Sequence, residues 1–136
     1  MGTIEIENSY IDDRTSQDRY APTIGAGRSS LCEEIEIENC YIDGAGIGGS
    51  NNQADFFDDP KITRIYIKKS TIYAVANTKA GTNRINARAA IGSGCYGAIG
   101  NIYITESKIE AKSEGGAGIG SGGYYSDDSS GELNWK

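Results

Sequence analysis

Residues 102–122 read IYITESKIEAKSEGGAGIGSG, and the spacing of their isoleucines recurs three more times in the chain. Aligning the four copies places isoleucines in four columns. The columns are Ile4, Ile35, Ile65 and Ile102; Ile6, Ile37, Ile67 and Ile104; Ile11, Ile42, Ile72 and Ile109; and Ile24, Ile47, Ile91 and Ile119. A fifth column, three residues before the first, holds Met1, Cys32, Ile62 and Ile99. Of nineteen isoleucines only Ile85 lies elsewhere. This regularity indicates repeated units that bury their apolar faces against one another, so we expect every column isoleucine to be buried.

The repeat predicts an all-β fold, because its short apolar segments alternate with a period of two. In Ile102-Tyr103-Ile104 the isoleucines face one way and the tyrosine the other, whereas a helix needs apolar partners at three and four residues. Three short strands per unit make one coil of a parallel β-helix. We expect one module over residues 1–136, with coils at about 3–27, 34–50, 64–94 and 101–122 and the first strand of a fifth at 131–136.

The ends of this solenoid are expected to be open. Leu133 and Trp135 align with inward positions of a fifth coil that stops after one strand, and no helical or polar cap is recognisable at either end. Solenoids normally need such caps, and uncapped strand edges pair with other chains. We therefore expect either a parent protein with more coils or end-to-end self-association.

Charge and composition exclude several classes of function. The net charge of −6 disfavours nucleic acid and anionic membranes as partners, since both reward excess Lys and Arg. No apolar run is long enough for membrane insertion. Met1 leads directly into the first expected strand, so we expect no signal peptide in this chain. The absence of histidine removes the commonest general base, and three GxGxxG matches follow from the repeat itself.

The three cysteines are expected to stay reduced. Cys32 occupies an inward column, and Cys40 shares a column of small residues with Ser9, Ser70 and Ser107. Cys95 lies on a corner after the Ile91 strand. Positions two coils apart are separated by about 9.6 Å, beyond the reach of a disulfide.

Outward positions supply the candidate sites. Glu5 and Glu36 share one column, and Glu7 and Glu38 share another that continues to Lys68. Stacked carboxylates repel one another unless a cation bridges them, so a Ca²⁺ site is one interpretation. A solvated acidic face, relieved by Lys68, is the alternative.

Two pairs of tyrosines also share outward columns on neighbouring coils. They are Tyr66 with Tyr103 and Tyr10 with Tyr41. Exposed tyrosine rings on a flat sheet can stack on sugars, and Lys68 completes this set of candidate ligand-binding residues. Ordinary packing between neighbouring strands is the alternative.

The corners and insertions carry weaker signals. Asn8 and Asn39 share a corner column that favours a short asparagine ladder, interrupted by Lys69 and Glu106. Insertions within residues 12–21, 74–88 and 112–116 leave one corner, and residues 51–61 leave another. Such loops often build the binding face of a solenoid.

The units GTIEIENSYID, EIEIENCYIDGAGIGGS and NIYITESKIEAKSEGGAGIGSGG resemble the coils of pectate-lyase-like right-handed parallel β-helix repeats, of the kind found in bacterial surface and adhesin-like proteins. The resemblance implies a right-handed coil and an extracellular or cell-surface location. Enzymes of that superfamily carry clustered Asp with Arg or Lys on one face. The nearest grouping here is Arg64, Lys68 and Lys69 beside Glu36 and Glu38, which matches no catalytic motif.

The expected function is therefore that of a non-catalytic surface module that binds a glycan or another cell-surface ligand. A polysaccharide lyase or glycoside hydrolase that uses Ca²⁺ is the alternative. A purely structural spacer is the third interpretation.

Overall fold

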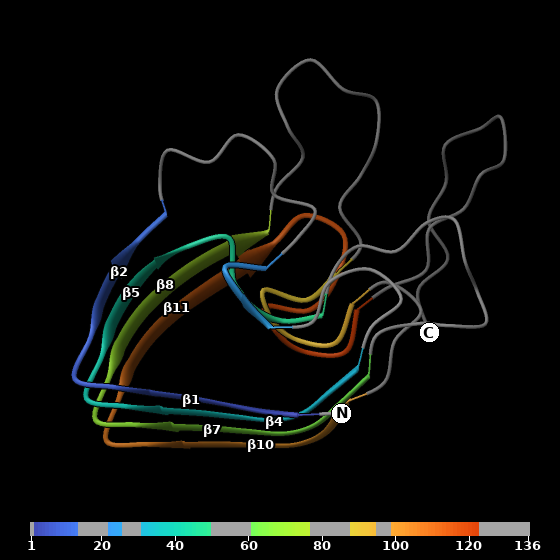
Figure 1. The fold of residues 1–136 in the computed structure, drawn as a ribbon. Helices are drawn as coiled ribbons and strands as arrows, with labels where there is room; N and C mark the ends of the chain where they lie inside the picture. The colour runs from blue at the N-terminus through green and yellow to red at the C-terminus, as the bar shows by residue number, and fades with distance from the viewer. Residues whose placement is uncertain are drawn as a thin grey trace, which may run out of the picture.

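The computed structural model describes residues 2–13, 22–25, 31–49, 61–76, 88–94 and 99–122, which form twelve strands and no helix. The strands build three parallel four-stranded sheets (Figure 1). Sheet A contains β1 (Thr3–Glu7), β4 (Leu31–Glu38), β7 (Lys61–Lys68) and β10 (Ile99–Thr105). Sheet B contains β2 (Tyr10–Asp12), β5 (Tyr41–Gly44), β8 (Thr71–Ala76) and β11 (Lys108–Ser113). Sheet C contains β3 (Ile24–Gly25), β6 (Ile47–Gly48), β9 (Ile91–Gly92) and β12 (Ile119–Gly120). The all-β prediction is confirmed, and this arrangement is consistent with a β-solenoid.

The strand register matches the isoleucine columns residue by residue. In sheet A, Ile4 pairs with Ile35, Ile35 with Ile65, and Ile65 with Ile102. The same one-to-one pairing joins the isoleucines of sheets B and C. A slip of one residue would turn every isoleucine outward, so burial of one face fixes this register. Strands β4 and β10 begin at Leu31 and Ile99, earlier than the expected coil starts at residues 34 and 101.

The expectation that every column isoleucine is buried is correct for the middle strands and for Ile24, and wrong for the other end strands. Ile35, Ile65 and Ile72 are 0% exposed. The partly buried isoleucines are Ile4, Ile6, Ile11, Ile99, Ile102, Ile104 and Ile109, and Ile119 is 45% exposed. Among the described strands, those at the two ends pack against one neighbour instead of two, which leaves one side of most of their isoleucines uncovered.

The corner between sheets A and B uses the left-handed backbone conformation in every repeat. Asn8, Asn39, Lys69 and Glu106 have φ of 53°, 55°, 51° and 48°. Asparagine tolerates this conformation better than most residues. The Asn39 side-chain amide donates a hydrogen bond of 2.7 Å to the Asn8 side-chain carbonyl, so the expected short asparagine ladder is present.

Sheet C is held together by glycines that stack without side chains. A Cβ at Gly48 would lie 1.8 Å from the Gly92 carbonyl oxygen, and a Cβ at Gly92 would lie 1.8 Å from the Gly120 carbonyl oxygen. Both residues also have positive φ, 129° and 141°. Steric space and backbone conformation therefore both require glycine here.

Arg88 is a core residue that the sequence analysis placed in an insertion. Its side chain is 0% exposed, and its guanidinium donates hydrogen bonds to the carbonyls of Ala45 and Ala89. No repeat column marks this position. Only the structure shows that this residue, which lies between β8 and β9, is buried.

Cys32 and Cys40 are buried free thiols, as expected. Burial raises the pKa of the Cys32 thiol. Several positions named in the sequence analysis lie outside the described residues. They are Met1, Cys95, the residues of the predicted fifth-coil strand and most of the predicted insertions. Within the described ranges, no helix is long and apolar enough to cross a membrane.

Candidate functional site

The outward face of sheet A presents its side chains in rows that run across the strands. Because strand residues alternate between the two faces, every second residue of β1, β4, β7 and β10 points away from the isoleucine core. The register aligns these residues into three rows. The first row is Thr3, Glu34, Arg64 and Asn101; the second row is Glu5, Glu36, Tyr66 and Tyr103; and the third row is Glu7, Glu38, Lys68 and Thr105.

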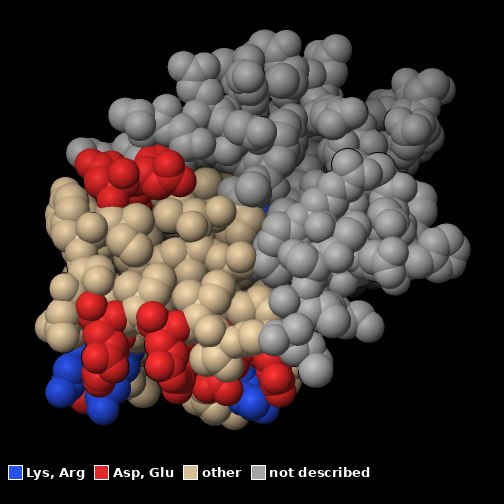
Figure 2. Space-filling view, viewed as in Figure 1, with Lys and Arg blue, Asp and Glu red and all other residues tan. Residues whose placement is uncertain are grey.

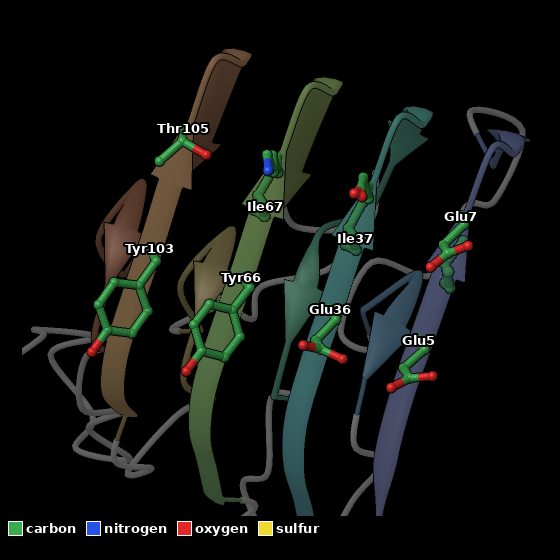
Figure 3. A pocket seen from close by; sticks show the side chains of 11 residues that line it. Glu5, Glu7, Glu36, Ile37, Tyr66, Ile67, Tyr103 and Thr105 are labelled. Carbon is green, nitrogen blue, oxygen red and sulfur yellow. The ribbon is translucent and has the colours of Figure 1, made fainter.

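The second and third rows line a groove of about 460 Å³, which we call the sheet A groove. Figure 3 shows Glu5, Glu36, Tyr66 and Tyr103 side by side on their four strands, with Glu7 and Thr105 in the neighbouring row. One half of the groove is therefore carboxylate and the other half is aromatic. The structure brings together seven predicted site residues here, namely Glu5, Glu7, Glu36, Glu38, Lys68, Tyr66 and Tyr103.

Tyr66 and Tyr103 form a stacked pair, with ring centroids 4.9 Å apart and planes 9° from parallel. Nearly parallel rings this close must overlap partly face to face, so each ring covers part of the other. The remaining faces point toward Glu36 on one side and past the edge strand β10 on the other. Tyr103 is 47% exposed. The pair thus offers open ring surface at its two ends rather than one continuous two-ring platform.

The carboxylate half is not a set of independent charges. A hydrogen bond with the Glu5 carboxyl raises the pKa of Glu36, and desolvation and the negative charge of Glu34 raise it further. Glu34 in turn accepts hydrogen bonds from Arg64, whose Nη2 lies 3.2 Å from its Oε2. This ion pair raises the pKa of the Arg64 guanidinium. Arg64 therefore pairs with Glu34, whereas the Glu36 carboxyl lies beside that of Glu5.

The carboxylates fit a calcium ion poorly. Ca²⁺ takes six to eight oxygen ligands, often from several carboxylates that converge on one point. Among the described residues, no three or more Asp, Glu, His or Cys side chains converge in this way. Glu5, Glu36, Glu7 and Glu38 instead follow one another along the sheet. The expected calcium site therefore stays a prediction from the sequence, and we derive no chemistry from it.

The other predicted tyrosine pair lies on sheet B. The rings of Tyr10 and Tyr41 are 4.9 Å apart and 6° from parallel, and Tyr10 is 69% exposed. They border a more open depression of about 420 Å³ with Asn8, Asn39 and Lys69. This pair repeats the geometry of Tyr66 and Tyr103, and Asp12 and Asp43 form the next outward row of sheet B beside it.

Charged side chains are clustered on the face seen in Figure 2. Asp and Glu side chains lie along the lower edge with Lys and Arg beside them, where Figure 1 places the strands of sheet A, and another group of acidic side chains lies at the upper left of the view. Thr105 and the pair of Arg64 with Glu34 were not identified as a site from the sequence. The column alignment could have predicted both, because it places Thr105 next to Lys68 and Arg64 next to Glu34 on neighbouring strands.

No protein family, no curated protein and no solved structure matches this chain.

Proposed function

We propose that this chain is a right-handed parallel β-helix of four coils, presented at a cell surface or outside the cell, that binds a glycan in the sheet A groove without transforming it. The feature that supports this proposal is the pairing of stacked tyrosines with polar side chains in one groove. Tyrosine rings contact the apolar faces of sugars, and carboxylate, ammonium and hydroxyl groups hydrogen-bond to their hydroxyls.

The charges of the groove favour one class of glycan. Among the described residues, four carboxylates and one ammonium, that of Lys68, line it. A polyanionic chain such as a polyuronate would meet like charges along β1 and β4 and would have to be desolvated against them. We therefore propose a neutral or amine-bearing oligosaccharide as the ligand. A protonated amine would donate hydrogen bonds to the carboxylates of Glu5 and Glu36 and would relieve their repulsion.

A glycan array that includes neutral, amine-bearing and uronate oligosaccharides tests this proposal, followed by titration calorimetry with the best ligand. The double substitution Tyr66→Ala and Tyr103→Ala should abolish binding. Tyr10→Ala with Tyr41→Ala is the matched control, since that pair has the same stacking geometry on another sheet. If only the control variant loses binding, the glycan binds on sheet B and not in the sheet A groove. Preferential binding of uronates would contradict the proposed ligand class.

Catalysis is the second candidate function, and the raised pKa of Glu36 favours it. Glycoside hydrolases pair a general acid of raised pKa with a second carboxyl group, and Glu36 has a raised pKa next to the carboxyl of Glu5. New reducing ends released from a bound oligosaccharide, and lost on Glu36→Gln, would support hydrolysis, and unsaturated products would support a lyase. Binding without products supports the non-catalytic function. If neither binding nor products are detected, the result supports a structural spacer.

A further inference from the structure

The two ends of the strand stack are incompletely covered. Strands β1, β2 and β3 pair only with β4, β5 and β6, and strands β10, β11 and β12 pair only with β7, β8 and β9 among the described residues. We call these surfaces the β1 end and the β10 end. Their core isoleucines, apart from Ile24 of β3, are partly exposed, in contrast to 2% or less for the isoleucines of β4, β5, β7 and β8. Among the described residues, apolar surface and strand edges without a partner strand therefore coincide at both ends, which is the usual condition for edge-to-edge pairing.

A ladder of serine hydroxyls shows how the β10 end matches the β1 end. The Cys40 N–H donates to the Ser70 hydroxyl at 3.1 Å, and the Ser70 N–H donates to the Ser107 hydroxyl at 3.1 Å. Ser9 occupies the same column on the first repeat. Its hydroxyl donates to the carbonyl two residues earlier, as the hydroxyls of Ser70 and Ser107 do. The Ser9 oxygen is therefore set to accept from the Ser107 N–H of another copy.

The corner backbone repeats the same relationship. The N–H groups of Asn8, Asn39 and Lys69 each donate to a carbonyl on the following strand of sheet A, at 3.1, 3.0 and 3.1 Å. Glu106 holds the fourth position with the same left-handed conformation. The carbonyl that corresponds to its acceptor is that of Glu7, at the β1 end. A second copy would supply this acceptor in the register that already joins β4 to β7.

In sheet A, charge favours one relative orientation of the two copies. The β1 end carries the outward carboxylates Glu5 and Glu7, whereas the outward residues of β10 are Asn101, Tyr103 and Thr105. Contact between two β1 ends would bring carboxylates together. Contact between a β10 end and a β1 end places Tyr103 beside Glu5, the same pairing that Tyr66 makes with Glu36 inside the chain.

We propose that copies of this chain bind head to tail, with the β10 end of one copy on the β1 end of the next, in the register Ile102 to Ile4 and Ile109 to Ile11. In this contact β1 of the next copy takes the position that the sequence analysis assigns to the strand expected at 131–136. Each of the three sheets then continues into the next copy. Such a contact uses two different surfaces and does not close on itself, so it produces open chains of copies rather than a symmetric dimer.

Sedimentation velocity of the whole chain over a wide concentration range tests this proposal. We expect a series of oligomers that lengthens with concentration. A chain that stays monomeric throughout would overturn the proposal. The next step is to block each end separately, with substitutions whose side chains point outward and leave the core unchanged.

Glu5→Pro blocks the β1 end. The Gly2 carbonyl and the Asn8 N–H both face β4, so alternation along the strand turns the Glu5 N–H toward the free edge. Proline there removes a donor that the isolated chain does not use, as edge strands allow. The association constant should fall by about tenfold.

Thr105→Glu blocks the β10 end. It places a carboxylate opposite Glu7 of the next copy and should lower the association constant by up to about fivefold. Within its own chain the new carboxylate lies beside Lys68. Thr105→Gln is the uncharged control, and the added substitution Glu7→Lys should restore association.

Mixing the two blocked variants tests the polarity of the contact. Each variant keeps one competent end, so the mixture should form dimers at concentrations at which neither variant associates alone. An association constant of either variant alone that equals that of the unsubstituted chain would show that copies associate through another surface and would overturn the proposal. Circular dichroism and melting temperature confirm that each variant is folded.

Discussion

The backbone carbonyl of Ala45 accepts a hydrogen bond from the guanidinium of Arg88, which lies 43 residues further along the chain. A second bond runs from Arg88 Nη1 to the carbonyl of Ala89 at 3.2 Å. The backbone carbonyl of Arg88 itself accepts from the Ser113 hydroxyl at 2.6 Å. This one buried residue thus links the corners of three successive repeats, at positions where the sheets leave backbone groups to be satisfied by side chains.

Arg88→Met should destabilise the fold. The substitution keeps apolar volume but leaves the carbonyls of Ala45 and Ala89 without these donors, at a cost of about 1–3 kcal/mol for each buried group left unsatisfied. Urea denaturation followed by circular dichroism measures the change. Arg64→Met is the control, because its partly exposed ion pair with Glu34 is worth only about 0–1 kcal/mol. Equal effects of the two substitutions would contradict a structural role for Arg88.

Ile67→Asp should unfold the chain, whereas Ile104→Asp should only weaken it. Ile67 is 1% exposed between Ile37 and Ile104, so an aspartate there would be buried without a polar partner. Ile104 belongs to the end strand β10 and is only partly buried, so its aspartate can reach water. Thermal melting of both variants provides the comparison. A cooperative, wild-type-like transition for Ile67→Asp would refute the register.

The fold should gain stability as the pH falls from neutral toward about 4, and Glu36 should account for part of this gain. Its pKa is raised in the folded state, so its contribution is present in full below the ordinary value for glutamate and is lost as the pH rises through the raised value. Glu36→Gln should flatten this part of the profile and raise the melting temperature at neutral pH. Glu106→Gln is a control at an exposed corner. A steeper profile for Glu36→Gln would contradict a raised pKa of Glu36 in the folded state.

Gly48→Ala should be far more damaging than Gly120→Ala in dilute solution. Both glycines have positive φ, 129° and 134°, so the conformational strain of alanine is similar. The new Cβ at position 48 would overlap the Gly92 carbonyl oxygen at 1.8 Å, whereas the nearest atom to a Cβ at position 120 is the Ala117 Cβ at 3.6 Å. Melting temperatures of the two variants separate steric overlap from strain. Equal losses would show that strain alone requires glycine in sheet C.

The sequence by itself determined the columns and therefore the register. Every pairing of Ile4, Ile35, Ile65 and Ile102 follows from their spacing, because a period of two and a fixed repeat leave one alignment that buries one face. The same alignment predicted the stacking of Tyr66 on Tyr103 and the neighbouring glutamates. These features depend on position along a regular lattice, which the spacing of residues encodes directly.

Only the tertiary structure decided which neighbours are missing and which side chains pair. The isoleucines of β1 and β10 have the same sequence environment as those of β4 and β7, yet they are partly exposed because nothing described packs beyond them. Three further features depend on the reach and rotamer of long side chains. They are the burial of Arg88, the hydrogen bond of Glu36 with Glu5 and the ion pair of Arg64 with Glu34. Those distances arise between residues of different repeats, and the spacing within a repeat does not contain them.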